Sequence, residues 1–195
     1  MIEMTISNSI RVKPFLFFII LIIQQYKTVF LKDIHSCPDL GYNVSMNIIL
    51  AADHAGFALK ETIKDFLQSK QYPVLDVGAD HLVPEDDYPV YMSAAALKVA
   101  QDLTGETRAI IFGGSGQGEA IVANRFPGVR AVVWYGGDEE IIRKSREHND
   151  ANVLSIGARF VGEDQAKKAV ELWLTTPFSN EEKHSRRNEL IDSIE

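Results

Sequence analysis

A glycine-rich loop carries the residues whose types and spacing most directly suggest chemistry. The stretch FGGSGQGEAIVANR, residues 112–125, places four glycines within six positions and follows them with the carboxylate of Glu119. When such a loop opens a helix, its unpaired backbone N–H groups can bind an anion or a developing oxyanion. Ser115 adds a hydroxyl to the same loop. The alternative is a tight strand-to-helix turn in which Glu119 only stabilises the first turn of the helix.

The loop departs from three known glycine motifs. Gly114 and Gly116 match the dinucleotide pattern GxGxxG, but Glu119 occupies the third glycine position, where a carboxylate would repel a pyrophosphate. The Gly-Lys-Ser/Thr ending of a P-loop does not occur in the chain. The GxSxG elbow of hydrolases requires a glycine at position 117, which is Gln117. The sequence therefore does not favour a nucleotide site or a serine hydrolase.

Two short histidine-containing clusters add ionisable groups. Asp53 and His54 directly follow an apolar run, and such a pair can hold a sugar hydroxyl or a phosphate. The alternative for this pair is a helix cap followed by a loop histidine. His148 lies in the cluster Glu147-His148-Asn149-Asp150. The alternative for His148 is a helix C-terminus at which the imidazole complements the helix dipole.

One dense basic cluster, KHSRR at 183–187, stands out in an otherwise acidic chain. On a helix, Lys183, Arg186 and Arg187 share one side, at a spacing suited to binding one phosphate. Arg159, at the end of a predicted strand, would add a fourth cation. The alternative is a solvated helix face, which is the usual role of a charge run.

The apolar pattern predicts the elements that position these groups. Short runs rich in β-branched residues, typical of strands buried on both faces, occur at 47–52, 72–78, 108–114, 130–137 and 152–158. Helical patterns separate them, and a charged helix is expected over about 179–193. This alternation predicts an α/β fold: a doubly wound, five-stranded parallel sheet with helices on both faces, in a single domain.

The loops after the predicted strands bring polar groups from distant segments to one edge of the sheet. In a doubly wound sheet, ligands bind at the carboxyl ends of the strands, where the strand order reverses. The segments expected at this edge are 53–54, 84–88, 113–119, 136–138 and 157–159. We therefore expect a ligand site there.

Composition narrows the function classes. The chain has 195 residues, 46% of them hydrophobic, and a formal net charge of −7, which argues against a general nucleic-acid or anionic-membrane surface. Cys37 is the only cysteine, so a disulfide framework or a thiolate metal cluster within one chain is excluded. No HExxH motif or clustered His/Cys spacing occurs, and no metal site is expected. A reducing, cytoplasmic setting fits this composition best.

Residues 1–45 differ from the rest. Nine consecutive large apolar residues, 15–23, follow Arg11 and Lys13, too few to span a bilayer as a helix. They match the hydrophobic region of a secretory signal in length, but no small-residue cleavage site follows closely. Met46 directly precedes the first predicted strand. We therefore expect residues 46–195 to form the domain and 1–45 to be an upstream extension, with a signal or membrane-surface anchor, or a folded functional arm, as the alternatives.

Five motifs occur in order along the chain: AADHAGFALKETIKDFL, DDYP, GGSGQGEAIVANRFPGVRA, REHNDANVLSIGAR and KHSRR. Together they resemble the ribose-5-phosphate isomerase B family, which includes the galactose-6-phosphate isomerase subunits. The resemblance covers residues 46–195 and implies a Rossmann-like, metal-independent aldose–ketose isomerase without a cofactor. It also implies a homodimer or a dimer of dimers, with active sites shared between subunits.

The resemblance implies a role for each matching residue. Many members carry a cysteine base at the start of the glycine loop, where this chain has Gly113, whereas another branch carries a glutamate base at the position of Glu119. His148 would assist ring opening. The implied substrate-binding residues are Asp53, His54, Ser115, Gly116, Gln117, Gly118 and Asn149, and the implied phosphate-binding residues are Arg159, Lys183 and Arg187. Lys183 departs from the arginine usual in the glutamate branch, so bidentate phosphate binding is not expected there.

Ribose 5-phosphate is the expected substrate and ribulose 5-phosphate the expected product. Three alternatives stay open. A six-carbon sugar phosphate is one, a non-catalytic sugar-phosphate-binding or regulatory domain is the second, and a subunit that is active only with a different partner is the third.

Overall fold

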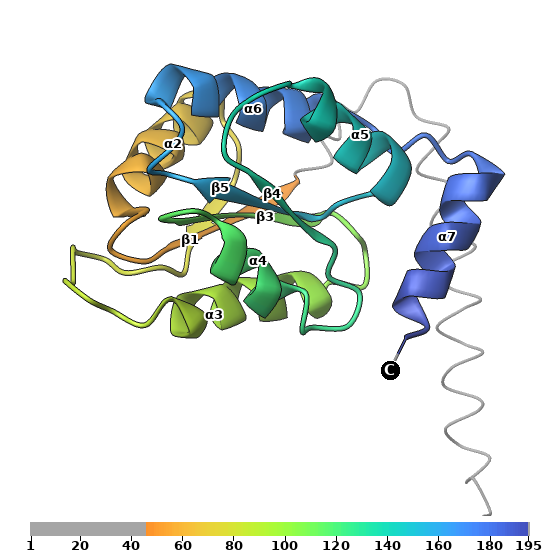
Figure 1. Ribbon diagram of the computed structural model, residues 1–195, viewed down its shortest axis with the longest axis horizontal. Helices are drawn as coiled ribbons and strands as arrows, with labels where there is room; N and C mark the ends of the chain where they lie inside the picture. The colour runs from red at the N-terminus through yellow and green to blue at the C-terminus, as the bar shows by residue number, and fades with distance from the viewer. Residues whose placement is uncertain (1–45, 195) are drawn as a thin grey trace, which may run out of the picture. The chain divides into compact units, whose positions relative to one another are not determined.

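A computed structural model describes residues 46–194, which belong to one compact unit, Val44–Glu195. Its sheet has five parallel strands in the order β2-β1-β3-β5-β4 (Figure 1). The strands are β1 (Asn47–Ala52), β2 (Val74–Asp76), β3 (Thr107–Gly113), β4 (Ala131–Trp134) and β5 (Val153–Gly157). The helices are α2 (Phe57–Ser69), α3 (Tyr88–Ala100), α4 (Gln117–Ala123), α5 (Glu140–Asn149), α6 (Glu163–Thr175) and α7 (Glu182–Asp192). The predicted fold class is confirmed.

Helices cover both faces of the sheet, and each face has its own apolar core (Figure 1). Helices α2, α5 and α6 pack on one face, whereas α3 and α4 pack on the other. Side chains alternate between the faces along a strand, so β1 serves both cores. Ile48 and Leu50 belong to the first core, and Ile49 and Ala51 to the second. The near-continuous apolar sequence of β1 follows from this double burial.

The strand order reverses between β1 and β3. From β1 the chain moves outward to β2 and then returns to the other side of β1 as β3. Ala52 at the end of β1 pairs in register with Phe112 near the end of β3. The segments that follow these two strands, 53–54 and 113–119, therefore emerge side by side at the switch point of the sheet, where doubly wound folds bind ligands.

Three elements are shorter in the structure than the sequence predicted, and left-handed backbone conformations explain two of these differences. Strand β4 ends at Trp134, because Gly136 and Gly137, with φ of 101° and 94°, cannot continue a strand. Asn180, with φ of 54°, precedes α7, so this helix begins at Glu182 and not near 179. Strand β2 has only three residues and directly follows Pro73.

Among the described helices, none is both long enough and apolar enough to cross a bilayer. The predictions for residues 1–45, including the apolar segment 15–23 and Cys37, lie outside the described residues.

Candidate active site

A cavity of about 420 Å³ opens at the carboxyl ends of β1, β3 and β5. It lies at the switch point of the sheet, as the strand pattern predicted. Its lining residues are Asp53, His54, Ala55, Tyr88, Gly114, Ser115, Gly118, Glu119, Arg159 and Phe160. Segments separated by up to about a hundred residues therefore meet around one small space.

The glycine loop between β3 and α4 is held in place by β5. Gly116 has φ of 80°, a left-handed conformation that glycine adopts at little cost. The buried hydroxyl of Ser155 donates a hydrogen bond of 2.6 Å to the carbonyl oxygen of Gly116. A Cβ atom on Gly157 would lie 2.7 Å from the carbonyl oxygen of Ser115, so this approach also requires glycine. The loop is thus a packed structure whose N–H groups at the start of α4 have no intrahelical acceptor.

Glu119 lies in the first turn of α4, and its side chain is buried although it is a carboxylate. Its carboxyl group occupies the space where a side chain at position 113 would lie, because a Cβ atom on Gly113 would overlap it. Burial raises the pKa of Glu119, and the negative charge of Asp53 raises this pKa further. A carboxylate whose pKa is raised is a stronger base than an ordinary one, so beside a cavity it is suited to accepting a proton from a ligand.

Asp53 is positioned by the turn that it caps. Its Oδ1 accepts hydrogen bonds of 3.0 Å from the N–H of Ala55 and 2.9 Å from the N–H of Gly56. Gly56 packs so closely on β3 that a Cβ atom there would lie 2.5 Å from the carbonyl carbon of Phe112. The start of α2 is therefore fixed against β3, and Asp53 lines the cavity from that position.

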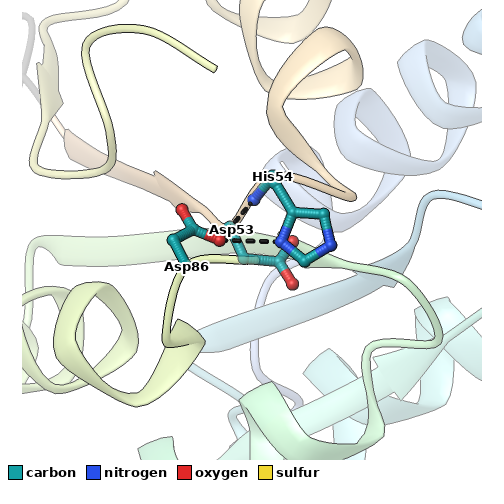
Figure 2. Close-up of side chains that lie close together, drawn as sticks. All are labelled: Asp53, His54 and Asp86. Atoms are coloured by element: carbon teal, nitrogen blue, oxygen red, sulfur yellow. Dashed lines mark hydrogen bonds and ion pairs between the residues drawn. The ribbon is translucent and has the colours of Figure 1, made fainter. Parts of the chain in front are cut away.

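His54 is held by Asp86, which comes from the segment between β2 and α3 (Figure 2). Asp86 Oδ1 accepts a 2.9 Å hydrogen bond from the backbone N–H of His54 and lies 2.8 Å from Nδ1 of the same residue. The carboxylate is buried, whereas about one third of the His54 side chain is exposed. The imidazole is therefore fixed on one side and open to the cavity on the other.

Asp53, His54 and Asp86 also form the one group of potential metal ligands found among the described residues, with ligand atoms within 4.8 Å of one another. Two of these ligand atoms already have hydrogen-bond partners within the protein. Asp53 Oδ1 caps the turn, and His54 Nδ1 pairs with Asp86. This arrangement suits a hydrogen-bonded substrate site better than a metal centre, whose ligands need lone pairs directed at the ion.

Arg159 and Tyr88 form two further sides of the cavity. The Arg159 guanidinium lies over Gly114, since a Cβ atom there would be 3.4 Å from Cζ of the arginine. The backbone N–H of Arg159 donates a 3.1 Å hydrogen bond to the carbonyl oxygen of Gly114. The Tyr88 hydroxyl lies over Gly118, where a Cβ atom would be only 2.7 Å from it. A cation and a hydroxyl thus approach the loop directly.

Of the other predicted site residues, Gly116 and Gln117 belong to the glycine loop but are not among the residues that line the cavity, and four more lie on α5 and α7. His148 stacks on His184 of α7, with ring centroids 4.1 Å apart and planes 8° from parallel. Lys183 is exposed and forms a 2.8 Å ion pair with Glu181, and Arg187 is exposed as well. Asn149 lines a different cavity, between β4 and α5. In one chain these four residues do not line the cavity that contains Glu119.

Sheet topology explains this separation. Helix α5 leads into the amino end of β5, whereas Glu119 follows the carboxyl end of β3. Because the strands are parallel, His148 lies near the amino ends of the strands and Glu119 near their carboxyl ends. A five-residue strand, at about 3.3 Å per residue, separates these two ends of the sheet by roughly 15 Å. A single chain therefore gathers Asp53, His54, the glycine loop, Glu119 and Arg159, but not His148, Asn149, Lys183 or Arg187.

The sequence did not single out four residues that the structure places in or against the site: Asp86, Tyr88, Ser155 and Phe160. Asp86 and Tyr88 lay in a loop expected at the correct edge, but nothing in the sequence indicates the pairing of Asp86 with a histidine 32 positions earlier. Ser155 has the appearance of an ordinary core residue of β5. Only its hydrogen bond to Gly116 reveals its role.

Comparison with known proteins agrees with this architecture. The family described as Ribose/Galactose Isomerase matches residues 48–191. Ribose-5-phosphate isomerase B from Escherichia coli (strain K12) is 40% identical over 149 residues, which cover 76% of the chain and 95% of that protein. Ribose-5-phosphate isomerase B from Mycolicibacterium paratuberculosis is 37% identical over 151 residues, covering 77% of the chain and 92% of that protein.

Solved structures are similar as well. The crystal structure of ribose-5-phosphate isomerase B from Mycoplasma genitalium with bound ribulose-5-phosphate superposes with a TM-score of 0.69 at 32% identity, covering 74% of the chain and 93% of that chain. The enzyme from Thermotoga maritima gives a TM-score of 0.69 at 35% identity, covering 76% and 99%. The matched length and the sequence identity together show that this chain and these proteins share a common ancestor. The chain belongs to the ribose/galactose isomerase family.

Proposed function

We propose that this protein interconverts ribose 5-phosphate and ribulose 5-phosphate, with Glu119 as the base that moves the proton between C2 and C1. The observation that carries the proposal is the position of the Glu119 carboxyl group, buried beside the glycine loop and in the space left by Gly113. The relatives named ribose-5-phosphate isomerase B support the substrate. In family members with a cysteine base at the position of Gly113, that side chain would fill the space that this chain fills with a carboxylate.

The proposed reaction begins with the open-chain aldose in the cavity. The Glu119 carboxylate takes the proton from C2, and the electrons of that C–H bond form the C1–C2 double bond of a cis-enediolate. The same carboxyl group then returns the proton to C1, while the hydroxyl proton on O2 moves to O1 and leaves the ketone at C2. Charge develops on the two oxygens, so N–H donors of the glycine loop and the Ser115 hydroxyl stabilise the intermediate.

Substrate binding is assigned to the groups around this base. Asp53 and His54 contact sugar hydroxyls, and Ser115 to Gly118 surround the reacting carbons. Arg159 provides a cation near the loop, and the phosphate far from C1 supplies binding energy that orients the reacting atoms.

The second half of the site is proposed to come from another copy of the chain. His148, Asn149, Lys183 and Arg187 carry the chemistry for ring opening and phosphate binding, yet they lie at the opposite edge of their own sheet. In a symmetric dimer, each copy can offer this edge to the partner's glycine loop. We therefore propose a homodimer, or a dimer of dimers, with each active site shared between subunits.

A six-carbon sugar phosphate is the alternative substrate, because the family description names both ribose and galactose isomerases. The cavity volume of about 420 Å³ accommodates a small sugar phosphate, and the partner's residues would set its depth.

A cytoplasmic setting is proposed on the single cysteine of the chain and on the metabolic role of the relatives.

The test is isomerisation of ribose 5-phosphate by the full-length protein without added metal, compared with Glu119→Gln. Removing a general base costs about 10²- to 10⁴-fold in kcat, so we expect turnover to collapse in Glu119→Gln while ribose 5-phosphate still binds. Absence of turnover with ribose 5-phosphate, but turnover with a six-carbon sugar phosphate, would replace the substrate. Binding without any turnover would contradict the assignment as an isomerase.

A further inference from the structure

Asp86 is a buried carboxylate that makes two contacts to His54. It also lies close to Tyr91, and its negative charge adds to burial in raising the pKa of that phenol. Its Oδ1 accepts the backbone N–H of His54 at 2.9 Å and lies 2.8 Å from Nδ1 of the ring. The side chain of Asp86 is 5% exposed, and among the described residues its Oδ2 has no hydrogen-bond partner. A buried carboxylate is costly unless it is paired, so the pairing of Asp86 with His54 offsets part of the cost of its burial.

The geometry fixes where the ring carries its proton. A carboxylate oxygen only accepts hydrogen bonds, so the short contact with Asp86 requires a proton on Nδ1 of His54. In the neutral ring, Nε2 then has a free lone pair. Nε2 lies on the side of the ring away from Asp86 (Figure 2), and His54 lines the cavity that contains Glu119. The ring therefore offers an acceptor to whatever occupies the cavity.

We propose that Asp86 is a positioning residue that holds neutral His54 in the Nδ1–H tautomer, so that Nε2 accepts a hydrogen bond from a sugar hydroxyl. This inference rests on the proposed function, in which His54 contacts the substrate. It adds the reason why Nε2 is the ring atom that faces the ligand: Asp86 occupies Nδ1, so Nε2 is the nitrogen left to accept a hydrogen bond from a hydroxyl.

A backbone contact makes the proposal testable with an isosteric variant. The same oxygen of Asp86 receives both the ring and the backbone N–H of His54. In Asp86→Asn, an inward NH₂ group would face that backbone N–H donor, so the amide has to direct its oxygen inward. Asp86→Asn therefore preserves the Nδ1–H tautomer, whereas Asp86→Ala removes the acceptor and releases the ring.

The experiment combines ¹⁵N NMR of the histidine rings at pH 8, in the unliganded full-length protein, with steady-state kinetics. His54→Asn assigns the resonance. We expect Nδ1 to be protonated in the wild type and in Asp86→Asn, and the proton to move to Nε2 in Asp86→Ala. In kinetics, Asp86→Ala should raise KM about tenfold and change kcat by less than about threefold, with Asp86→Asn close to the wild type.

Asp87→Asn is the matched control, because Asp87 is the exposed neighbour and its side chain makes no capping hydrogen bond to α3. This variant should match the wild type in both measurements. A wild-type His54 protonated on Nε2 would overturn the proposal, as would an Asp86→Asn variant as impaired as Asp86→Ala. The ring tautomer is measured without substrate, so it decides the role of Asp86 even if ribose 5-phosphate is not turned over.

Discussion

At the scale of single residues, the site depends on a carboxylate that is kept away from water. Glu119 is 5% exposed, and its carboxyl group lies in the space that a side chain at position 113 would fill. This burial favours the neutral carboxylic acid, whereas the proposed chemistry needs the carboxylate. If Glu119 is the base, as proposed, activity should decline as the pH falls through the raised pKa of Glu119.

The pH dependence of catalysis follows from this shift. Because the pKa of Glu119 is raised from 4.5, kcat/KM should fall on acidification with a midpoint above pH 4.5. Asp53→Asn keeps an acceptor oxygen for the turn but removes the negative charge beside Glu119, so its midpoint should lie at lower pH than that of the wild type. Rate profiles of both proteins between pH 4 and pH 9 measure the two midpoints. An Asp53→Asn midpoint at or above the wild-type value would contradict the electrostatic coupling.

The same shift predicts an effect on stability. A raised pKa means that the folded protein binds the proton on Glu119 more tightly than the unfolded chain does. The free energy of unfolding therefore decreases as the pH rises from 4.5 through the pKa of folded Glu119. Glu119→Gln lacks this titration, so its Tm should exceed that of the wild type at pH 8, and the difference should shrink near pH 4. Calorimetry at both pH values checks the sign, and a lower Tm for Glu119→Gln at pH 8 would refute it.

Gly113 and Glu119 should behave as one unit. In Gly113→Ala the new methyl group overlaps the Glu119 carboxyl group, which has to move. A displacement of about 1 Å at a reacting group can cost about 10²-fold in rate, so kcat should fall by that order while the fold persists. Gly162→Ala is the control, because a Cβ atom there meets nothing within 4 Å and the backbone φ is −77°. Equal kcat values for the two variants would exclude the proposed steric link.

At the scale of elements, the sheet positions one half of the proposed site, and α5 and α7 carry the residues proposed for the other half. Helix α7 packs on α5 through the stack of His184 on His148, and near its end Asp192 pairs with Arg130 at 3.0 Å. His184 is buried, and its Nε2 has no partner among the described residues. Burial lowers the pKa of His184, and the facing imidazole of His148 lowers it further.

Acidification should therefore loosen α7. The pKa of His184 is lower in the folded protein than in the unfolded chain, so the unfolded chain binds its proton more tightly. The neutral His184 therefore contributes fully to the free energy of unfolding above pH 6.5, and this contribution is lost as the pH falls through the folded pKa. The neighbouring charges of Lys183 and Arg187 act in the same direction, and Glu181 opposes them. Hydrogen exchange should show a smaller opening free energy for α7 at pH 5 than at pH 7.5. His184→Phe keeps a stacked ring without titrating, so a pH effect that persists in this variant would contradict the assignment.

At the scale of the whole molecule, the parallel sheet separates Glu119 from His148 by the length of a strand. No rearrangement of side chains can bring them together within one chain, since Glu119 follows the carboxyl end of β3 whereas His148 precedes the amino end of β5. Apolar side chains remain exposed near the carboxyl edge, including Ile121, Tyr135 and Phe160. Both features agree with the proposed pairing of two copies around shared sites.

Complementation measures this pairing directly. Glu119→Gln and His148→Ala should each be nearly inactive as homodimers. In a mixed dimer with shared sites, one site carries both substitutions and the other carries neither. Random mixing by co-expression should then restore about one quarter of the wild-type sites, because half of the dimers are mixed. Active sites contained within one chain would give no recovery above the two single variants.

The alternation of apolar runs and helical patterns was sufficient to predict the five parallel strands, the two helical layers and the edge that holds the cavity. These features can be predicted because a strand buried on both faces shows a continuous apolar run in its own sequence. The right-handed crossover between parallel strands applies to each strand–helix–strand unit regardless of the other units. The sequence could also nominate Glu119, Asp53, His54 and Arg159, since each directly follows a strand or the glycine loop.

Only the tertiary structure decided which of these residues meet. Three contacts show this. The Glu119 carboxyl group occupies the space beside Gly113, Asp86 hydrogen-bonds to His54, and Ser155 hydrogen-bonds to Gly116. The residues in these pairs are 6 to 39 positions apart in the chain. Such contacts depend on strand order and register, which a linear pattern does not encode. For the same reason the family resemblance could assign His148 and Lys183 to one site with Glu119, but only the direction of the strands shows that within one chain they lie at the opposite end of the sheet.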